Sequence, residues 1–298
     1  MSTKTKFQKP ALTFEEQIEL LKKRNLLITN IPQAQHYLRT VGYYRLMSYF
    51  KPFLMEPKDS EQGFKTGTNF SDILQLYTFD RKLRLLVTDA LERIEIALRS
   101  SISNVMSIKY GSHWYLDGKL FVNQASHDGF MIEIKKHLKQ TKEDFIQSYY
   151  KNYDSPEHPP SWMIIECLPF GAISKLYSGI TDRSARKQIG DIFGQYSEVL
   201  KSWMKSLTYT RNLCAHHARL WNRFFINKPK DIHIDLPIIE NSSPFILQAY
   251  IIIKLLNKVA PDNQWKEDLF SLFNNCSGVS FSAMGYGAEW KKDPIWDL

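Results

Sequence analysis

The 298-residue sequence predicts an all-α fold, and three observations support that prediction. Apolar residues recur at steps of three and four through most of the chain, which is the period of an amphipathic helix. With 43% apolar residues, the chain can bury a sizeable core. Only residues 231–239 alternate as a strand would, and Pro237 removes a backbone donor that a strand needs.

The first helices are expected to form a small N-terminal subdomain, residues 1–58. Thr13 followed by Glu16 is a capping-box pattern that predicts the start of the first helix. A second short helix is expected after Pro32, and the aromatic segment 33–53 should divide at Gly42 into two short helices. A polar loop with glycines then leads to the next element.

The longest predicted helix begins at Asn69 or Ser71, either of which can cap it, and its apolar positions run from Leu76 to Val105. The prolines of the linker 153–160 suggest a hinge or a domain edge. Further helices are predicted over 126–150, 162–180 with a break at Pro169, 182–193, 197–222, 244–258 and 263–275. We expect a helical core over 69–225 and a C-terminal helical extension and tail over 226–298.

Charge and cysteine usage narrow the class of protein. Lys and Arg number 39 against 31 Asp and Glu, so a polyanionic partner is compatible with the charge but not required by it. Three widely spaced cysteines argue against a disulfide framework and favour a reducing cytoplasm. No secretory signal is recognisable, and the longest apolar stretch, 244–256, is too short to cross a bilayer. We therefore expect a soluble cytoplasmic protein with no membrane partner.

The segment TYTRNLCAHHARLWNR, residues 208–223, concentrates polar groups that are costly to bury. If it is helical at about 100° per residue, four of its polar residues share a face about 60° wide, with Arg211 at the flank and His217 on another side. The four residues are Asn212, His216, Arg219 and Arg223.

Arginine and histidine on one helix face suit the cleavage of RNA by its own 2′-hydroxyl. Histidine has a pKa near neutrality and can accept the hydroxyl proton, so His216 is a candidate general base. Arg211 can stabilise the phosphorane with two parallel hydrogen bonds, and Asn212 can orient the imidazole or the phosphate. Because the nucleophile belongs to the substrate, no cofactor or metal ion is expected.

RNLCAH, Arg211 to His216, fits the R-x4-6-H signature of HEPN ribonucleases, and the whole segment resembles abortive-infection (Abi) proteins of the AbiD/AbiF-like type. Blocks at 41–53, 76–102, 166–180 and 202–222 are similar to this family's blocks in their usual order. The resemblance implies a HEPN-type helical bundle, RNA cleavage or RNA binding, antiphage defence or toxin–antitoxin behaviour, and a homodimer that joins two motifs. It also implies a small non-coding RNA as a possible partner.

Other residues have both supporting and purely structural interpretations. Arg219 and Arg223 are expected to contact phosphate or to form a solvated face. His217 is expected to be structural or to support the site, whereas Cys214 and Trp221 are expected in the core. Zinc is not expected, because Cys214, His216 and His217 match no paired ligand spacing.

The long helix contributes a further set of charged residues. Glu92, Arg93, Glu95 and Arg99 suit surface ion pairs, although in a HEPN bundle Glu95 or Arg99 would orient Arg211 or His216. Arg211 and His216 themselves have an alternative as a helix-capping arginine and a buried core histidine. The aromatic residues of 43–53 suit a small core and also the stacking of RNA bases.

Two function classes remain open at this stage. The first is a metal-independent endoribonuclease acting in defence, and the second is a non-catalytic RNA-binding protein that holds a small RNA on the same basic face. A third option is a toxin whose motif is silenced by modification. The first two require the same residues, so the chemistry of the RNA products has to distinguish them.

Overall fold

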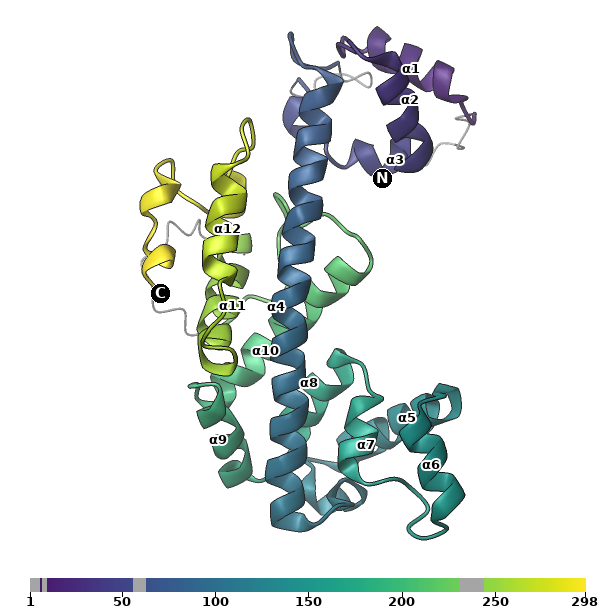
Figure 1. The fold of residues 1–298 in the computed structure, drawn as a ribbon, viewed down its shortest axis with the longest axis vertical. Helices are drawn as coiled ribbons and strands as arrows, with labels where there is room; N and C mark the ends of the chain where they lie inside the picture. Colours follow the sequence, from purple (N-terminus) through teal and green to yellow (C-terminus); the bar gives the residue numbers. More distant parts are fainter. Residues whose placement is uncertain (1–5, 7–9, 56–62, 231–243) are drawn as a thin grey trace. The chain divides into compact units, whose positions relative to one another are not determined.

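The computed structural model describes residues 6, 10–55, 63–230 and 244–298, and its fold is all-α, as predicted (Figure 1). Within these ranges, extended pairing is limited to isolated single-residue bridges. The strand expected at 231–239 lies outside the described residues. The chain divides into two compact units, with residues 1–82 and 274–279 in unit 1 and residues 83–273 and 280–298 in unit 2. The division falls inside the longest helix, whereas the sequence suggested a break in the loop before it.

Unit 1 includes α1 (Phe14–Lys23), α2 (Ile31–Thr40) and α3 (Tyr43–Met47), together with the first part of the long helix described next. The capping box is confirmed, since Thr13 accepts from the Glu16 N–H and the Glu16 carboxylate accepts from the Thr13 N–H. Gly42 separates α2 from α3 with a φ of 92°, a conformation that glycine adopts without steric cost. Tyr49 and Phe50 are buried in this unit. Tyr49 also donates a hydrogen bond to the buried carboxylate of Asp80.

Helix α4 (Phe70–Tyr110) is the longest element, and its prediction is confirmed. The Asn69 side chain accepts a hydrogen bond from the Ser71 N–H and so caps the first turn. Beyond the unit boundary, one face of α4 is fully buried and consists of Leu83, Val87, Ala90, Ile94, Leu98 and Ile102. Their spacing of three or four residues is the pattern that the sequence showed.

The remaining helices belong to unit 2, apart from the last residue of α12. They are α5 (Gln124–Gln140), α6 (Asp144–Asn152), α7 (Ser161–Glu166), α8 (Phe170–Gly179), α9 (Arg183–Ile192), α10 (Ser197–Ala215), α11 (Phe245–Val259) and α12 (Trp265–Asn274). The break at Pro169 is confirmed. No helix in the described part of the chain is long and apolar enough to cross a membrane.

Two predicted helix boundaries are wrong. The helix expected over 126–150 is interrupted at Thr141, which is extended and whose hydroxyl accepts from the Glu143 N–H. Such a local side-chain bond competes with helical hydrogen bonding. The helix expected over 197–222 ends at Ala215, seven residues early.

Helix α10 is the central element of unit 2 and packs against α8, α9 and α11. Its contact with α11 includes a buried polar group, Gln248, whose amide oxygen accepts from Thr210 at 2.8 Å and whose amide nitrogen donates to Ser206 at 2.9 Å. These bonds satisfy a fully buried amide that would otherwise be costly to desolvate. Because Thr210 immediately precedes Arg211, these bonds fix α10 against α11 next to the motif arginine.

The linker 153–160 lies inside unit 2, so it is not a domain edge. Hydroxyl groups of Tyr149 and Tyr115 donate to the carbonyls of Pro156 and Pro159 at 2.6 Å each. The ring nitrogen Nε2 of His113 lies 2.9 Å from the carbonyl oxygen of His158. The linker is therefore anchored at several points rather than built as a hinge.

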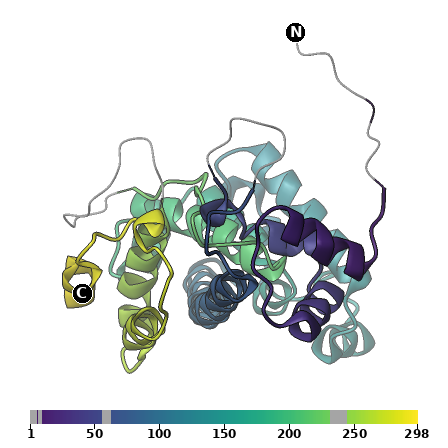
Figure 2. The same cartoon turned by 90° about the horizontal axis from the view of Figure 1, so that it is seen from above.

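The C-terminal tail packs on α12 through aromatic rings, and both views show the two side by side (Figures 1 and 2). Phe273 of α12 stacks on Phe281 with a centroid separation of 4.3 Å and meets Tyr286 edge-on at 5.0 Å. Trp290 and Trp296 complete the cluster. Burial of these large rings stabilises the tail against the helix, so residues 280–298 form an integral layer of unit 2.

Candidate functional site

The candidate motif occupies the last turn of α10 and the residues that follow it. Arg211 and Asn212 lie in the helix, and His216 is the C-cap residue, whose N–H donates to the Asn212 carbonyl at 3.0 Å. Arg211 is half-buried, whereas Asn212 and His216 are exposed. The alternative of a buried core histidine at position 216 is therefore wrong.

His217 ends the helix through its backbone. Its φ of 54° is left-handed, its N–H donates to the Cys214 carbonyl at 3.0 Å, and the Ala218 N–H donates to the Leu213 carbonyl at 2.8 Å. These two bonds form a Schellman motif with His217 at the position that glycine usually takes. The motif turns the chain away from the helix axis, so His216 marks the exposed end of α10.

Arg211 is held from α4 by Glu95. The Arg211 Nε lies 3.7 Å from Oε2 of Glu95, while Oε1 of the same carboxylate accepts from Arg99. The Glu95 and Arg99 side chains are only 12% and 10% exposed, in contrast to 39% for Arg211. One nearly buried carboxylate therefore joins the motif arginine to a second, buried guanidinium.

Arg99 serves the backbone of the corner between α7 and α8. Its guanidinium donates to the carbonyls of Ile165, of Glu166 at 3.2 Å and of Leu168 at 2.6 Å. These carbonyls lie at or just after the end of α7, where few helical N–H donors remain, so Arg99 adds donors to a nearly buried corner. These bonds, together with the one to Glu95, engage both terminal amino groups of Arg99.

Arg219 and Arg223 do not lie on the helical face that the sequence suggested, because the helix ends before them. Arg219 donates to the Asn222 carbonyl at 3.4 Å and lies 6.0 Å from the ring centre of Trp221. Arg223 donates to the Arg219 carbonyl at 3.2 Å. Both side chains are half-buried and engage the turn that follows α10. The prediction that four polar residues share one helical face is therefore wrong. Of these four, only Asn212 lies in the helix, and His216 is its C-cap residue.

The core assignments within the motif are confirmed. Cys214 and Trp221 are buried, and the Trp221 indole donates to the Ser280 carbonyl at 2.9 Å.

Near the α7–α8 corner, burial raises the pKa of the Cys167 thiol, which favours the neutral form. Across the described ranges, no cluster of three or more His, Cys, Asp or Glu side chains is arranged to hold a metal ion.

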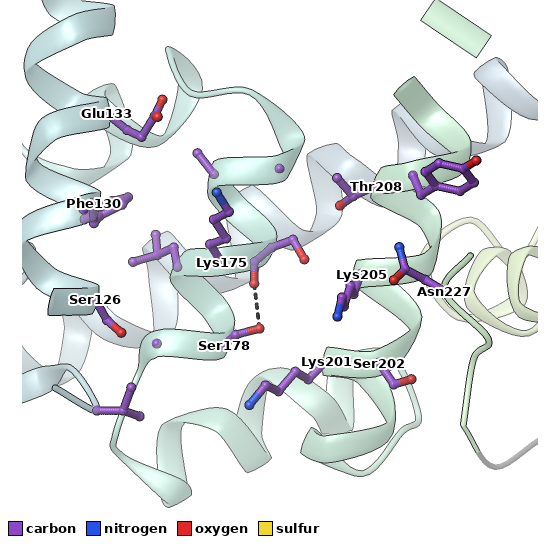
Figure 3. A pocket seen from close by; sticks show the side chains of 18 of the residues that line it. Ser126, Phe130, Glu133, Lys175, Ser178, Lys201, Ser202, Lys205, Thr208 and Asn227 are labelled. Atoms are coloured by element: carbon purple, nitrogen blue, oxygen red, sulfur yellow. Dashed lines mark hydrogen bonds between the residues drawn. The ribbon is translucent and has the colours of Figure 1, made fainter. Parts of the chain in front are cut away.

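A groove of about 1160 Å³ opens beside the motif, between α5, α8, α10 and the chain that follows the motif (Figure 3). Asn212 is one of its lining residues. Lys201 and Lys205 point from α10 into the space that faces α8, where Lys175 lies (Figure 3). Lys228 and Lys230 line it from the segment after the motif.

Sequence reasoning missed these lysines because they come from three separate segments. One signal was present in the sequence. Lys201, Lys205, Thr208 and Asn212 step by four, three and four residues, which places them on one face of α10. The groove itself depends on the packing of α8 and α5 against each other and of α8 against α10.

Comparison with known proteins places the chain in a family. At the significance threshold of the comparison, neither a curated protein nor a solved structure matches it. A family model described as Abi-like protein matches residues 36–222, which is more than half of the chain and includes α4, α8, α10 and the motif. The chain therefore belongs to the Abi-like protein family.

Proposed function

We propose that this Abi-like protein is a metal-independent HEPN endoribonuclease that cleaves RNA during abortive infection or as a toxin. The observation that supports the proposal best is the end of α10. There an arginine held by a carboxylate is followed, five residues later, by an exposed histidine at the helix end. Membership of the Abi-like family agrees with a role in abortive-infection defence.

In the proposed reaction, His216 takes the proton of the ribose 2′-hydroxyl. An exposed imidazole can approach a flexible RNA strand and act there as a general base. The oxygen then attacks the adjacent phosphorus, the bond from phosphorus to the 5′-oxygen breaks, and the leaving oxygen takes up a proton. The products carry a 2′,3′-cyclic phosphate and a 5′-hydroxyl.

Arg211 has the role of stabilising the charge that develops on the phosphorane. Glu95 lies on the Nε side of its guanidinium, at 3.7 Å, which leaves the two terminal amino groups as donors toward the non-bridging oxygens. A guanidinium held in place loses less entropy when the charge develops than a free one does. Asn212 precedes His216 by one turn and lines the groove, where its amide can donate to a phosphate oxygen.

A homodimer is part of the proposal, since an exposed motif can pair with its copy across a two-fold axis. Mixing His216→Ala with Arg211→Ala subunits restores part of the cleavage if the site is shared between chains and each half-site works alone. A monomer that cleaves RNA at micromolar concentration would contradict the shared site.

The test uses purified protein, total RNA and typing of the fragment ends. We expect cleavage that persists in EDTA, leaves DNA and 2′-deoxy linkages intact, and is lost in Arg211→Ala and in His216→Ala. Thermal unfolding should change by only a few degrees in both variants, because the His216 side chain is exposed and that of Arg211 is 39% exposed. Fragments with 5′-phosphate ends, or activity restored by magnesium after EDTA, would indicate a metal nuclease instead. Tight binding of one small RNA without any cleavage would favour the non-catalytic alternative.

A further inference from the structure

We infer that the groove between α5, α8 and α10 binds single-stranded RNA by its sugar–phosphate backbone and leads it to the end of α10. The inference rests on the proposed function for the class of ligand. It adds the strand state of that RNA and the surface that holds it.

The charge of the groove suits a polyanion. Five lysines line it, Lys175, Lys201, Lys205, Lys228 and Lys230, against two carboxylates, Glu133 and Glu198. Glu198 is engaged with Arg186 at 2.9 Å, which reduces its effect on a ligand. All of these lysines except Lys201 are exposed, so their ammonium groups are accessible to the phosphates of a ligand.

The groove follows α10 directly to the motif. The stripe of Lys201, Lys205, Thr208 and Asn212 lies on one helix face and extends about 17 Å at 1.5 Å per residue. It ends at Asn212, one turn before His216. A strand whose phosphates follow the lysines would therefore arrive at the two exposed polar residues of the motif.

The segment 226–230, which lines the groove after the motif, is fixed to α10 by hydrogen bonds. The Trp203 indole donates to the Lys230 carbonyl at 2.7 Å, and the Ser206 hydroxyl donates to the Asn227 carbonyl at 2.7 Å. The Lys230 N–H also donates to the Ser202 hydroxyl at 3.1 Å. The backbone at Asn227 and Lys230, on either side of Lys228, is thus fixed beside the stripe by contacts that involve neither lysine ammonium group.

Apolar side chains in the groove favour a single strand over a duplex. Val122, Ile132 and Ile226 are 51%, 65% and 69% exposed and line the same groove as the lysines. Unpaired bases can cover such side chains, whereas the paired bases of an A-form duplex are directed inward and leave mainly phosphates and 2′-hydroxyls outside. The lysines therefore suit the phosphates of a single strand, and the exposed aliphatic side chains suit its unpaired bases.

The experiment measures RNA binding by fluorescence anisotropy in a His216→Ala background, so that cleavage does not interfere. Lys201→Gln/Lys205→Gln removes the two lysines of the stripe. Lys187→Gln/Lys292→Gln is the matched control, because both of these lysines are 76% exposed and neither lines the groove. Since Lys201 is half-buried, Lys205→Gln/Lys228→Gln, which changes exposed residues only, guards against a folding defect.

We expect each groove pair to bind labelled single-stranded RNA roughly 25-fold more weakly at about 0.1 M salt. The slope of log K against log salt should fall by about 1.4, from the release of about 0.7 counterions per phosphate contact. Uridine-rich and mixed sequences should weaken equally, because phosphate contacts carry no sequence information. The control pair should bind as the parent does.

Binding that is unchanged in both groove pairs would overturn the inference and leave the proposed nuclease intact. Tighter binding of a duplex than of a single strand would overturn the assignment of the strand state. Groove-dependent binding by a protein that cleaves no RNA would support the groove while refuting the proposed catalysis. Failure of the parent to bind any RNA would overturn both.

Discussion

Replacing Glu95 with Gln tests whether the motif arginine is held from α4. The substitution keeps the shape and an oxygen acceptor but removes the charge that lies between Arg99 and Arg211. Glu92→Gln is the matched control, because Glu92 is exposed on the same helix three residues earlier. The two variants lose the same charge, so a difference between them reports the position of Glu95.

The expected loss of folding stability in Glu95→Gln follows from how exposed its two partners, Arg99 and Arg211, are. The bond to Arg99 is nearly buried, and replacing a charged acceptor there with a neutral one costs about 1–2 kcal/mol. The pair with Arg211, whose side chain is 39% exposed, adds no more than about 1 kcal/mol. A total of about 2 kcal/mol lowers the midpoint of thermal unfolding by roughly 4–8 °C for a unit of this size.

Two assays are needed, because stability and arginine placement are separate consequences. Circular dichroism follows thermal unfolding, and a fluorogenic RNA follows cleavage, which we expect to fall by about 10- to 100-fold when Arg211 loses its fixed position. An unfolding midpoint equal to that of Glu92→Gln would refute the energetic reasoning. A lowered midpoint with unchanged cleavage would show that Glu95 supports the fold but does not position Arg211.

Two further predictions concern the helix end and a charged cap. His217→Gly should preserve cleavage, whereas His217→Val should be less stable than His217→Gly by about 1–2 kcal/mol in urea unfolding, because a β-branched residue resists the left-handed φ of 54°. Equal stability of the two variants would argue against the Schellman motif. Asp182 accepts from Lys109, from Tyr110 at 2.5 Å and from the first turn of α9, and these bonds hold the pKa of its carboxyl well below the usual range. A lowered folded-state pKa means that this stabilisation is present above the unfolded-state pKa of about 3.9 and is lost as pH falls below it. The stability difference between the parent and Asp182→Asn should therefore shrink in urea titrations between about pH 5 and pH 2, and a constant difference would contradict the assignment.

Local pattern was sufficient for most helices of this protein and for the location of the motif. The capping box at Thr13, the apolar steps along α4 and the break at Pro169 all follow from interactions within a few residues, which the sequence displays directly. The burial of Cys214 and Trp221 was also predictable, since small or aromatic apolar groups are costly to expose. Membership of the Abi-like family agrees with the blocks that the sequence showed.

The end of α10 shows where local pattern fails. The residue that takes a left-handed conformation at a helix end is usually glycine or asparagine, but here it is His217. Because histidine does not indicate a helix end, the sequence suggested a helix that continues to 222. That error placed Arg219 and Arg223 on a helical face that does not exist. The chain after the turn is held by contacts distant in sequence: the Trp221 indole donates to the Ser280 carbonyl, and the Ser206 hydroxyl donates to the Asn227 carbonyl.

The sequence by itself pointed to the motif residues of the candidate site, whereas the tertiary structure decided how they are arranged and which other residues lie beside them. Periodicity reports contacts within one helix, so it predicted most of α10, and the resemblance of residues 211–216 to the R-x4-6-H signature pointed to Arg211 and His216. It cannot report that Glu95 meets Arg211 or that Arg99 is committed to backbone carbonyls of residues 165–168, because these partners lie many residues apart. The lysine groove arises in the same way, from three segments that become neighbours only when their apolar faces pack.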